Sequence, residues 1–257
     1  MSKKRPKGRL PRAYRNREFM DTVDARPIRI LSEYLHPLSH FRKENIQDTI
    51  VFFGSARTFE TSEHGRYYAE AKELARKLTL WSNSLHQSHR RFVVCTGGGP
   101  GIMEAGNRGA LEAGGQTIGL NISLPFEQRP NPFITPDLSF EFHYFFMRKF
   151  WFAYLAKALV VFPGGFGTLD ELTELLTLIQ TEKLLKDLPI VLYGTSFWKE
   201  ILNFDALVKY GMISQDDLDL FVFVDDVDEA FVYLRDSLTR LHLAESVEAP
   251  DLEHTEE

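Results

Sequence analysis

The stretch Phe162-Pro163-Gly164-Gly165-Phe166-Gly167-Thr168-Leu169-Asp170-Glu171 decides the fold, because it joins an apolar strand at 158–162 to an amphipathic helix through a glycine turn. Glycines allow positive φ and a close approach of the backbone to a ligand. The first N–H groups of a helix have no partner inside it, and the helix dipole favours negative charge there. The sequence therefore predicts a phosphate-binding turn made by Gly164, Gly165, Gly167 and Thr168.

A tight turn before a capped helix, with no ligand, would have a similar sequence, and short motifs match by chance. Two further segments have a similar order. In 93–103 an apolar strand leads into a helix through a turn with Gly97, Gly98, Gly99 and Gly101, and in 50–57 an apolar strand leads to a basic residue through Gly54 and Ser55. Ligands of open α/β folds bind at the carboxyl edge of the sheet, so we expect all three turns to face one crevice. Neither a dinucleotide fingerprint nor a P-loop is present in them.

Apolar runs alternate with amphipathic segments along most of the chain, and strands buried on both faces require such runs. The predicted fold is α/β, a Rossmann-like doubly wound parallel sheet with right-handed crossovers. Predicted strands are 50–53, 92–95, 117–121, 139–142, 158–162, 190–193 and 220–224. Predicted helices are one or two short ones within 19–45, then 64–80, 102–113, 146–156, 169–185, 198–210 and 227–241.

The chain has 257 residues with 44% hydrophobic content, which suits a single α/β domain. We expect a basic disordered arm at 1–18, a helical N-terminal extension at 19–47, the nucleotide-binding catalytic domain at 48–243 and an acidic disordered tail at 244–257. No apolar run reaches the roughly 20 residues of a membrane span. Cys95, the only cysteine, lies in a predicted buried strand and fits a reducing, cytoplasmic compartment.

Two other segments are predicted to lie near the ligand. The proline-rich loop 124–133 follows a strand, and we interpret it as a rim or lid over the base or ribose. The aromatic segment 140–152 is more typical of core or subunit interface than of a nucleobase platform. Arg148 within it needs an anionic or π partner to offset its desolvation.

The ordered motifs 97–105, Met147-Arg148-Lys149 and 163–171 together resemble the LONELY GUY family of nucleoside 5′-monophosphate phosphoribohydrolases, formerly labelled possible lysine decarboxylases. The resemblance covers roughly residues 48–243. It implies that Arg148 and Glu171 are catalytic and that Met147 and Lys149 contact the substrate. It also implies hydrolysis of a nucleoside 5′-monophosphate, such as AMP or an N6-modified AMP, to free base and ribose 5-phosphate. No metal or organic cofactor is implied, and each site of a homodimer would borrow residues from its partner.

Three other functions are consistent with parts of the sequence. A carrier of molybdenum cofactor, or a nucleotide sensor, would use the same turns without hydrolysing anything. Lysine decarboxylation would need a Schiff-base lysine with a pyridinium partner, for which no lysine is evidently placed. Binding of single-stranded nucleic acid by the basic arm is disfavoured by a net charge of −6.

Overall fold

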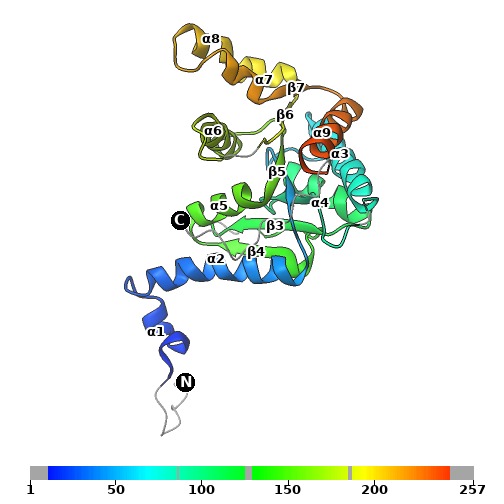
Figure 1. Ribbon diagram of the computed structural model, residues 1–257. Helices are drawn as coiled ribbons and strands as arrows, with labels where there is room; N and C mark the ends of the chain where they lie inside the picture. Colours follow the sequence, from blue (N-terminus) through cyan, green and yellow to red (C-terminus); the bar gives the residue numbers. More distant parts are fainter. Residues whose placement is uncertain (1–10, 86, 125–128, 185–186, 244–257) are drawn as a thin grey trace.

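The computed structural model describes residues 11–85, 87–124, 129–184 and 187–243. Its centre is a seven-stranded parallel sheet with the order β4-β3-β2-β1-β5-β6-β7 (Figure 1). The strands are β1 (Thr49–Phe53), β2 (Val93–Thr96), β3 (Thr117–Ile122), β4 (Ser139–Phe142), β5 (Ala156–Val161), β6 (Ile190–Tyr193) and β7 (Val222–Val224). The predicted doubly wound α/β fold is confirmed.

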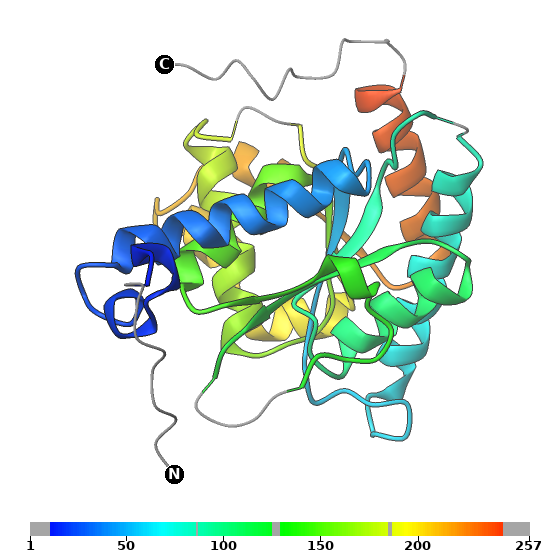
Figure 2. The same cartoon turned by 90° about the horizontal axis from the view of Figure 1, so that it is seen from below.

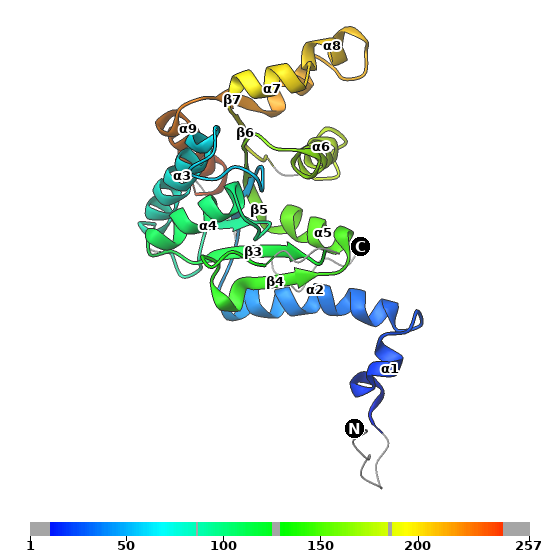
Figure 3. The same cartoon turned by 180° about the vertical axis from the view of Figure 1, so that it is seen from behind.

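Helices cover both faces of the sheet. They are α1 (Arg17–Met20), α2 (Arg26–Lys43), α3 (Gly65–Asn83), α4 (Ile102–Glu112), α5 (Phe145–Leu155), α6 (Phe166–Gln180), α7 (Thr195–Ile201), α8 (Phe204–Lys209) and α9 (Val227–His242). In Figure 3, α3, α4 and α9 lie together on one side, with α5 and α6 on the other. Alternate residues of the strands feed two cores, so that Phe52 faces α3 and α4 while Phe53 faces α5.

The N-terminal extension is more regular than the sequence predicted. Its main helix, α2, has 18 residues rather than forming only short pieces. Figure 2 shows α2 lying across the same side of the sheet as α5. Phe41 of α2 makes edge-to-face contacts with Phe140 and Trp151, with ring centroids 5.3 and 5.2 Å apart. The aromatic face of α2 is therefore part of the core.

Two helix predictions differ most from the structure in their bounds. Helix α6 begins at Phe166 rather than 169, because the Gly165 carbonyl already accepts the Leu169 N–H at 3.0 Å. It ends at Gln180, and Glu182 just beyond it has a left-handed φ of 56°. The predicted helix 198–210 is two helices, because Leu202 is extended and the Asn203 side chain caps α8 by accepting the Ala206 N–H.

Some predictions concern segments only partly described. The basic arm falls mostly on residues 1–10, outside the described part, and its remainder includes a 3-10 turn at Ala13–Arg15 and the start of α1. The acidic tail 244–257 and residues 125–128 of the proline-rich loop also lie outside it. None of the helices in the described ranges is long and apolar enough to cross a membrane.

Candidate active site

The sheet order places two of the predicted turns at its switch point. The chain runs outward from β1 to β4 and then returns to pair β5 with β1, so β1 and β5 are neighbours whose following segments diverge to opposite faces. The carboxyl ends of these two strands are joined by hydrogen bonds: the Ser55 N–H donates to the Pro163 carbonyl at 3.0 Å, and the Phe162 N–H to the Phe53 carbonyl at 2.9 Å. Ligands of open α/β proteins bind at such a point.

The loop 97–101 joins the same edge. The Ile102 N–H donates to the Ser55 carbonyl at 3.0 Å. Gly101 has a φ of 70°, and a Cβ there would overlap the Ser55 carbonyl oxygen, so this close approach requires glycine. A Cβ at Gly54 would meet the Ile102 side chain at 2.6 Å. The structure thus brings the three predicted turns together, and in these two positions glycine allows the turns to pack closely on one another.

A buried amide network fixes the 97–101 loop. Asn131 Nδ2 donates to the carbonyls of Gly98 and Gly99 at 3.2 and 3.0 Å and to Asn107 Oδ1 at 2.9 Å. Thr96 Oγ1 also donates to Asn107 Oδ1, at 2.7 Å, and accepts the Gly98 N–H at 2.9 Å. Neither Asn131 nor Asn107 was predicted from the sequence to belong to the site. An amide residue between two prolines, which lack N–H groups, was the available signal for Asn131.

The 163–168 turn has a different kind of glycine. A Cβ at Gly164 would overlap Thr168 Oγ1, so this glycine makes room for the hydroxyl. Gly165 and Gly167 have ordinary negative φ, and a Cβ at either would meet no described atom within 4 Å. Nothing in the described fold explains the missing side chains. The first turn of α6 also has no side-chain cap from any described residue. Its N–H groups are therefore open to an acceptor from outside the chain.

Arg148 and Glu171 form an ion pair between α5 and α6. Arg148 Nη2 lies 3.0 Å from Glu171 Oε1, and the two side chains are 14% and 6% exposed. Burial raises the pKa of the Glu171 carboxyl, and the charge of Arg148 opposes that rise. Burial lowers the pKa of Arg148, and Glu171 opposes that change. Buried ion pairs gain little net stability after desolvation, so stability alone gives little reason for this one.

The Arg148 guanidinium has a buried donor atom with no partner in the described structure. Its Nε is buried and has no hydrogen-bond partner among the described residues. The guanidinium carbon lies 5.2 Å from the ring centroid of Phe145 and 5.6 Å from that of Phe152. The aromatic contacts help to offset its desolvation, while the N–H still requires an acceptor. Arg148 is therefore arranged to make one more polar contact than the described chain provides.

The two residues flanking Arg148 have different environments. Met147 is 8% exposed and packs in the core with α5, so its side chain is held away from solvent. Lys149 Nζ lies 2.9 Å from Asp170 Oδ2 and 2.6 Å from Glu174 Oε2, both on α6. Burial acts to lower the pKa of Lys149, but the hydrogen bonds to Glu174 and Asp170 outweigh it, and the pKa is raised. Lys149 therefore ties α5 to α6 beside the Arg148–Glu171 pair.

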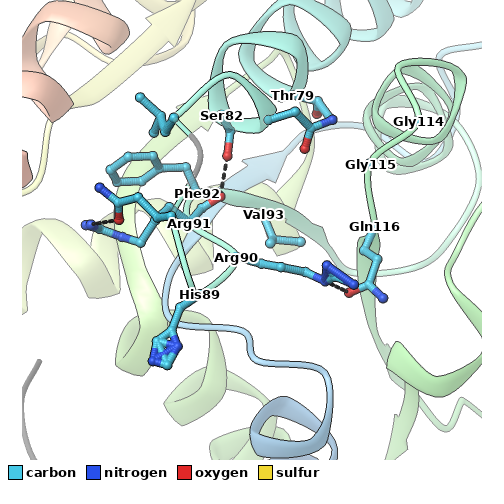
Figure 4. Close-up of a pocket in the computed structure, with 13 residues that line it drawn as sticks. Thr79, Ser82, His89, Arg90, Arg91, Phe92, Val93, Gly114, Gly115 and Gln116 are labelled. Atoms are coloured by element: carbon cyan, nitrogen blue, oxygen red, sulfur yellow. Dashed lines mark hydrogen bonds between the residues drawn. The ribbon is translucent and has the colours of Figure 1, made fainter.

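Two cavities of about 370 Å³ each lie on the described surface. One is beside the ion pair and is lined by Lys149, Asp170, Thr173, Glu174, Thr177 and Leu178. The other lies at the opposite, amino edge of the sheet, where Ser82 donates to the Arg91 carbonyl and Arg90 to Gln116 (Figure 4). No predicted site residue lines this second cavity. Among the described residues, no group of three or more His, Cys, Asp or Glu side chains is placed to hold a metal ion.

Cys95 is not part of the site. It is 2% exposed within β2, and burial raises the pKa of its thiol, so it is an unreactive core residue.

The fold and the meeting of the three turns define an open α/β protein of the kind that holds small ligands at its switch point. The chain belongs to the family described as "Possible lysine decarboxylase", whose model matches residues 103–234, about half of its length. This is the LONELY GUY family, as the motifs indicated.

The comparisons with individual proteins are more distant. The pyrimidine/purine nucleotide 5′-monophosphate nucleosidase of Escherichia coli K12 is 33% identical in an alignment 120 positions long, which covers 41% of this chain and 25% of that protein. The chain thus matches a quarter of that relative's length. Among solved structures, TM1055 gives a TM-score of 0.52 at 22% identity, covering 74% of this chain and 99% of that one. The molybdenum cofactor carrier protein of Chlamydomonas reinhardtii gives 0.51 at 23%, covering 76% and 99%. These two likenesses show the fold.

Proposed function

We propose that this protein is a hydrolase that cleaves the N-glycosidic bond of nucleoside 5′-monophosphates, giving free base and ribose 5-phosphate. One observation carries the proposal. The first two turns of α6 combine an uncapped N-terminus, open at Gly165 and Gly167, with a buried carboxylate paired to Arg148. Free N–H groups at a helix N-terminus bind phosphate, and a carboxylate takes part in the cleavage of a glycosidic bond. The name of the E. coli relative supports a nucleotide hydrolase.

The mechanism assigns each group one role. The N–H groups at Gly165, Gly167 and Thr168 hold the 5′-phosphate, and this remote binding energy positions the reacting bond. Cleavage builds positive charge on C1′ and O4′, which Glu171 stabilises as a carboxylate while it accepts a proton from the attacking water. The C1′–N bond breaks as the water oxygen bonds to C1′, and the base leaves with the bonding electrons and takes up a proton from solvent, to which Glu171 returns the one it accepted, so that the net change is the addition of one water. Arg148 orients Glu171 and offers its free Nε–H to the substrate.

The test is the release of base from a panel of 5′-monophosphates, with each matching nucleoside as control. We expect the nucleotides to be cleaved and the nucleosides to be poor substrates, because only the nucleotides engage the α6 N-terminus. Equal turnover of nucleoside and nucleotide would contradict the role of the 163–168 turn. Release of base from no member of the panel would contradict the proposed function.

We further propose adenine nucleotides as the substrates, including AMP with an apolar group on N6, which would make the product a cytokinin-type base. Phe145, Phe146 and Phe166 are 50%, 50% and 92% exposed around the ion pair and the turn. Such aromatic surface favours a flat base or an apolar substituent over a polar one. The panel should therefore contain AMP, an N6-isoprenoid AMP and a pyrimidine 5′-monophosphate, and a preference for the pyrimidine would contradict this choice.

A non-catalytic carrier of a nucleotide or of molybdenum cofactor is the alternative. Such a protein needs the phosphate-binding turn, but it gains nothing from a buried acid placed beside it. The desolvated Arg148–Glu171 pair therefore favours hydrolysis. A ligand that copurifies with the chain, together with no ribose 5-phosphate from any nucleotide, would favour the carrier.

The pH dependence of kcat should report the environment of the Arg148–Glu171 pair. Glu171 must be ionised to stabilise the cation, and burial raises its pKa above the ordinary 4.5. We therefore expect kcat to fall as the pH drops through an apparent pKa above 4.5, a value that belongs to the coupled pair. The rate kcat is the quantity to measure, because ionisation of the free substrate phosphate affects kcat/KM. An acid limb at or below 4.5 would contradict the role of the buried carboxylate.

We also propose a cytoplasmic homodimer with shared active sites. Three aromatic side chains of α5, Phe145, Phe146 and Phe150, are 50%, 50% and 37% exposed on one stretch of surface beside Arg148. Exposed apolar groups of this size favour a partner surface. Sedimentation equilibrium should give twice the chain mass, and a monomer at micromolar concentration would contradict the dimer.

A further inference from the structure

The N-terminus of α5 is capped by a side chain from another helix. The carboxylate of Glu33, on α2, accepts the His143 N–H at 2.8 Å through one oxygen and the Tyr144 N–H at 3.2 Å through the other. Tyr144 is the N-cap residue of α5, and its own side chain makes no capping bond within the described structure. A carboxylate at this position satisfies free N–H groups and is favoured by the helix dipole. Glu33 thus holds the two residues that precede the first turn of α5.

A short series of hydrogen bonds connects Glu33 to Arg148. The Tyr144 carbonyl accepts the Met147 N–H at 3.1 Å and the Arg148 N–H at 3.3 Å. One peptide residue, Tyr144, therefore lies between the carboxylate of Glu33 and the backbone of Arg148. The Arg148 side chain then reaches Glu171 at 3.0 Å. The position of the guanidinium depends on the turn that Glu33 holds.

Other contacts of α2 fix the direction of α5. Trp151 Nε1 donates to the backbone carbonyl of Glu33 at 3.1 Å. The ring of Tyr34 stacks on Trp151 with centroids 5.6 Å apart. Arg29 Nε donates to the Tyr144 hydroxyl at 3.3 Å. Helix α2 therefore contacts α5 at its first residues and again one to two turns later, and rotation of α5 about either contact is restricted.

We propose that Glu33 is a positioning residue for Arg148, so that the extension at 19–47 takes part in the reaction without touching the substrate. The inference rests on the proposed function, because it concerns the rate of that hydrolysis. Displacement of a catalytic group by about 1 Å can cost about 10²-fold in rate. The 163–168 turn belongs to α6 and makes no described contact with Glu33, so we expect phosphate binding to be retained.

The experiment compares Glu33→Ala and Glu33→Gln with the wild-type protein. Lys43→Ala is the matched control, because Lys43 lies on the same helix, its ion pair with Asp137, at 2.7 Å, is exposed, and no contact in the described structure joins this pair to α5. We expect Glu33→Ala to lower kcat for base release at least tenfold, with the affinity for ribose 5-phosphate within twofold of wild type. Glu33→Gln keeps one acceptor oxygen and recovers part of the rate. The Lys43→Ala variant behaves as wild type.

Two further measurements separate positioning from general loss of structure. Amide hydrogen exchange at residues 143–148 should be faster in Glu33→Ala and unchanged in Lys43→Ala. In a background of Arg148→Lys, which retains charge but not the guanidinium fork, Glu33→Ala should cost much less than it does alone, because both changes act on one group. If Glu33→Ala does not fold, the same comparisons are made with Glu33→Gln.

Unchanged exchange at 143–148, a wild-type kcat in Glu33→Ala, or full additivity with Arg148→Lys would each overturn the inference. The failure of the proposed function is a different result. If wild-type protein releases base from no nucleotide, the hydrolase proposal fails on its own. The exchange comparison then tests the contact alone: faster exchange confined to the Glu33 variants shows that Glu33 holds the turn before Arg148, and unchanged exchange removes the inference.

Discussion

Glu171→Gln should lower kcat for base release by 10²- to 10⁴-fold, the range that a positioned acid or base contributes. The glutamine is nearly isosteric, so it can still accept a hydrogen bond from Arg148 Nη2, which lies 3.0 Å from Glu171 Oε1. It cannot carry the negative charge that a cationic transition state requires, nor accept the proton of the attacking water. Binding of ribose 5-phosphate should remain, because the α6 amides are unchanged. The measurement is base released under saturating nucleotide.

The neighbouring acid Glu174 supplies the control for this prediction. Glu174 is on the same helix and accepts from Lys149 at 2.6 Å, but it has no contact with Arg148 in the described structure. Glu174→Gln should therefore retain most of the rate. Equal losses from the two substitutions would indicate a general electrostatic effect on α6. Normal turnover by Glu171→Gln would remove Glu171 from the reaction.

Gly167→Ala should have opposite effects on stability and on activity. A Cβ at this position meets no described atom within 4 Å, and the residue lies in the first turn of α6 with negative φ. Replacing glycine by alanine in a compatible helical position stabilises a fold by about 0.4–1 kcal/mol. The same methyl group would occupy the space that we assign to the phosphate. A lost hydrogen bond to a charged group costs about 1.5–3 kcal/mol, so KM should rise at least tenfold.

The free energy of unfolding, measured in urea, tests the expected effect on stability, and the KM for AMP tests the expected effect on activity. Gly114→Ala is a suitable comparison for stability, because Gly114 has equal space but a φ of 74°, so alanine there should destabilise through strain. If Gly167→Ala is more stable and keeps a wild-type KM, the phosphate binds elsewhere. If it is less stable, the position has a structural role that the contacts do not reveal.

Much of the fold followed from local sequence. The strands were found because parallel strands covered on both faces must be apolar throughout, as at Thr49–Phe53, where every residue is buried. Helix ends were less predictable. The break at Leu202 had a signal in Asn203, a good N-cap, but the apolar periodicity continues across it. The length of α2 was missed because its apolar residues pack against segments about 100 positions later, and no window along the chain contains both partners.

The candidate site also has parts that could be predicted from the sequence and parts that could not. Parallel strands end at one edge, so the meeting of Gly54, Gly97 and Gly164 could be expected from three local patterns and the sheet rule. The pairing of Arg148 with Glu171 was available only from family resemblance, because its geometry depends on how α5 and α6 pack. The contributions of Asn131 and Glu33 arise from contacts 24 to 111 positions apart along the chain. Only the folded chain reveals them.

Helix α5 carries both buried and exposed apolar residues. Met147, Trp151 and Phe152 face inward and are nearly inaccessible, whereas Phe145, Phe146 and Phe150 are 37–50% exposed. Substitutions at accessible positions usually change stability by less than about 0.5 kcal/mol. In an evolving lineage, substitutions at these exposed positions should therefore cost the fold little, while they change the surface that we propose for the base and for the dimer partner. Descendants of one ancestor could acquire different nucleobase preferences by a few such steps and keep a common way of breaking the bond.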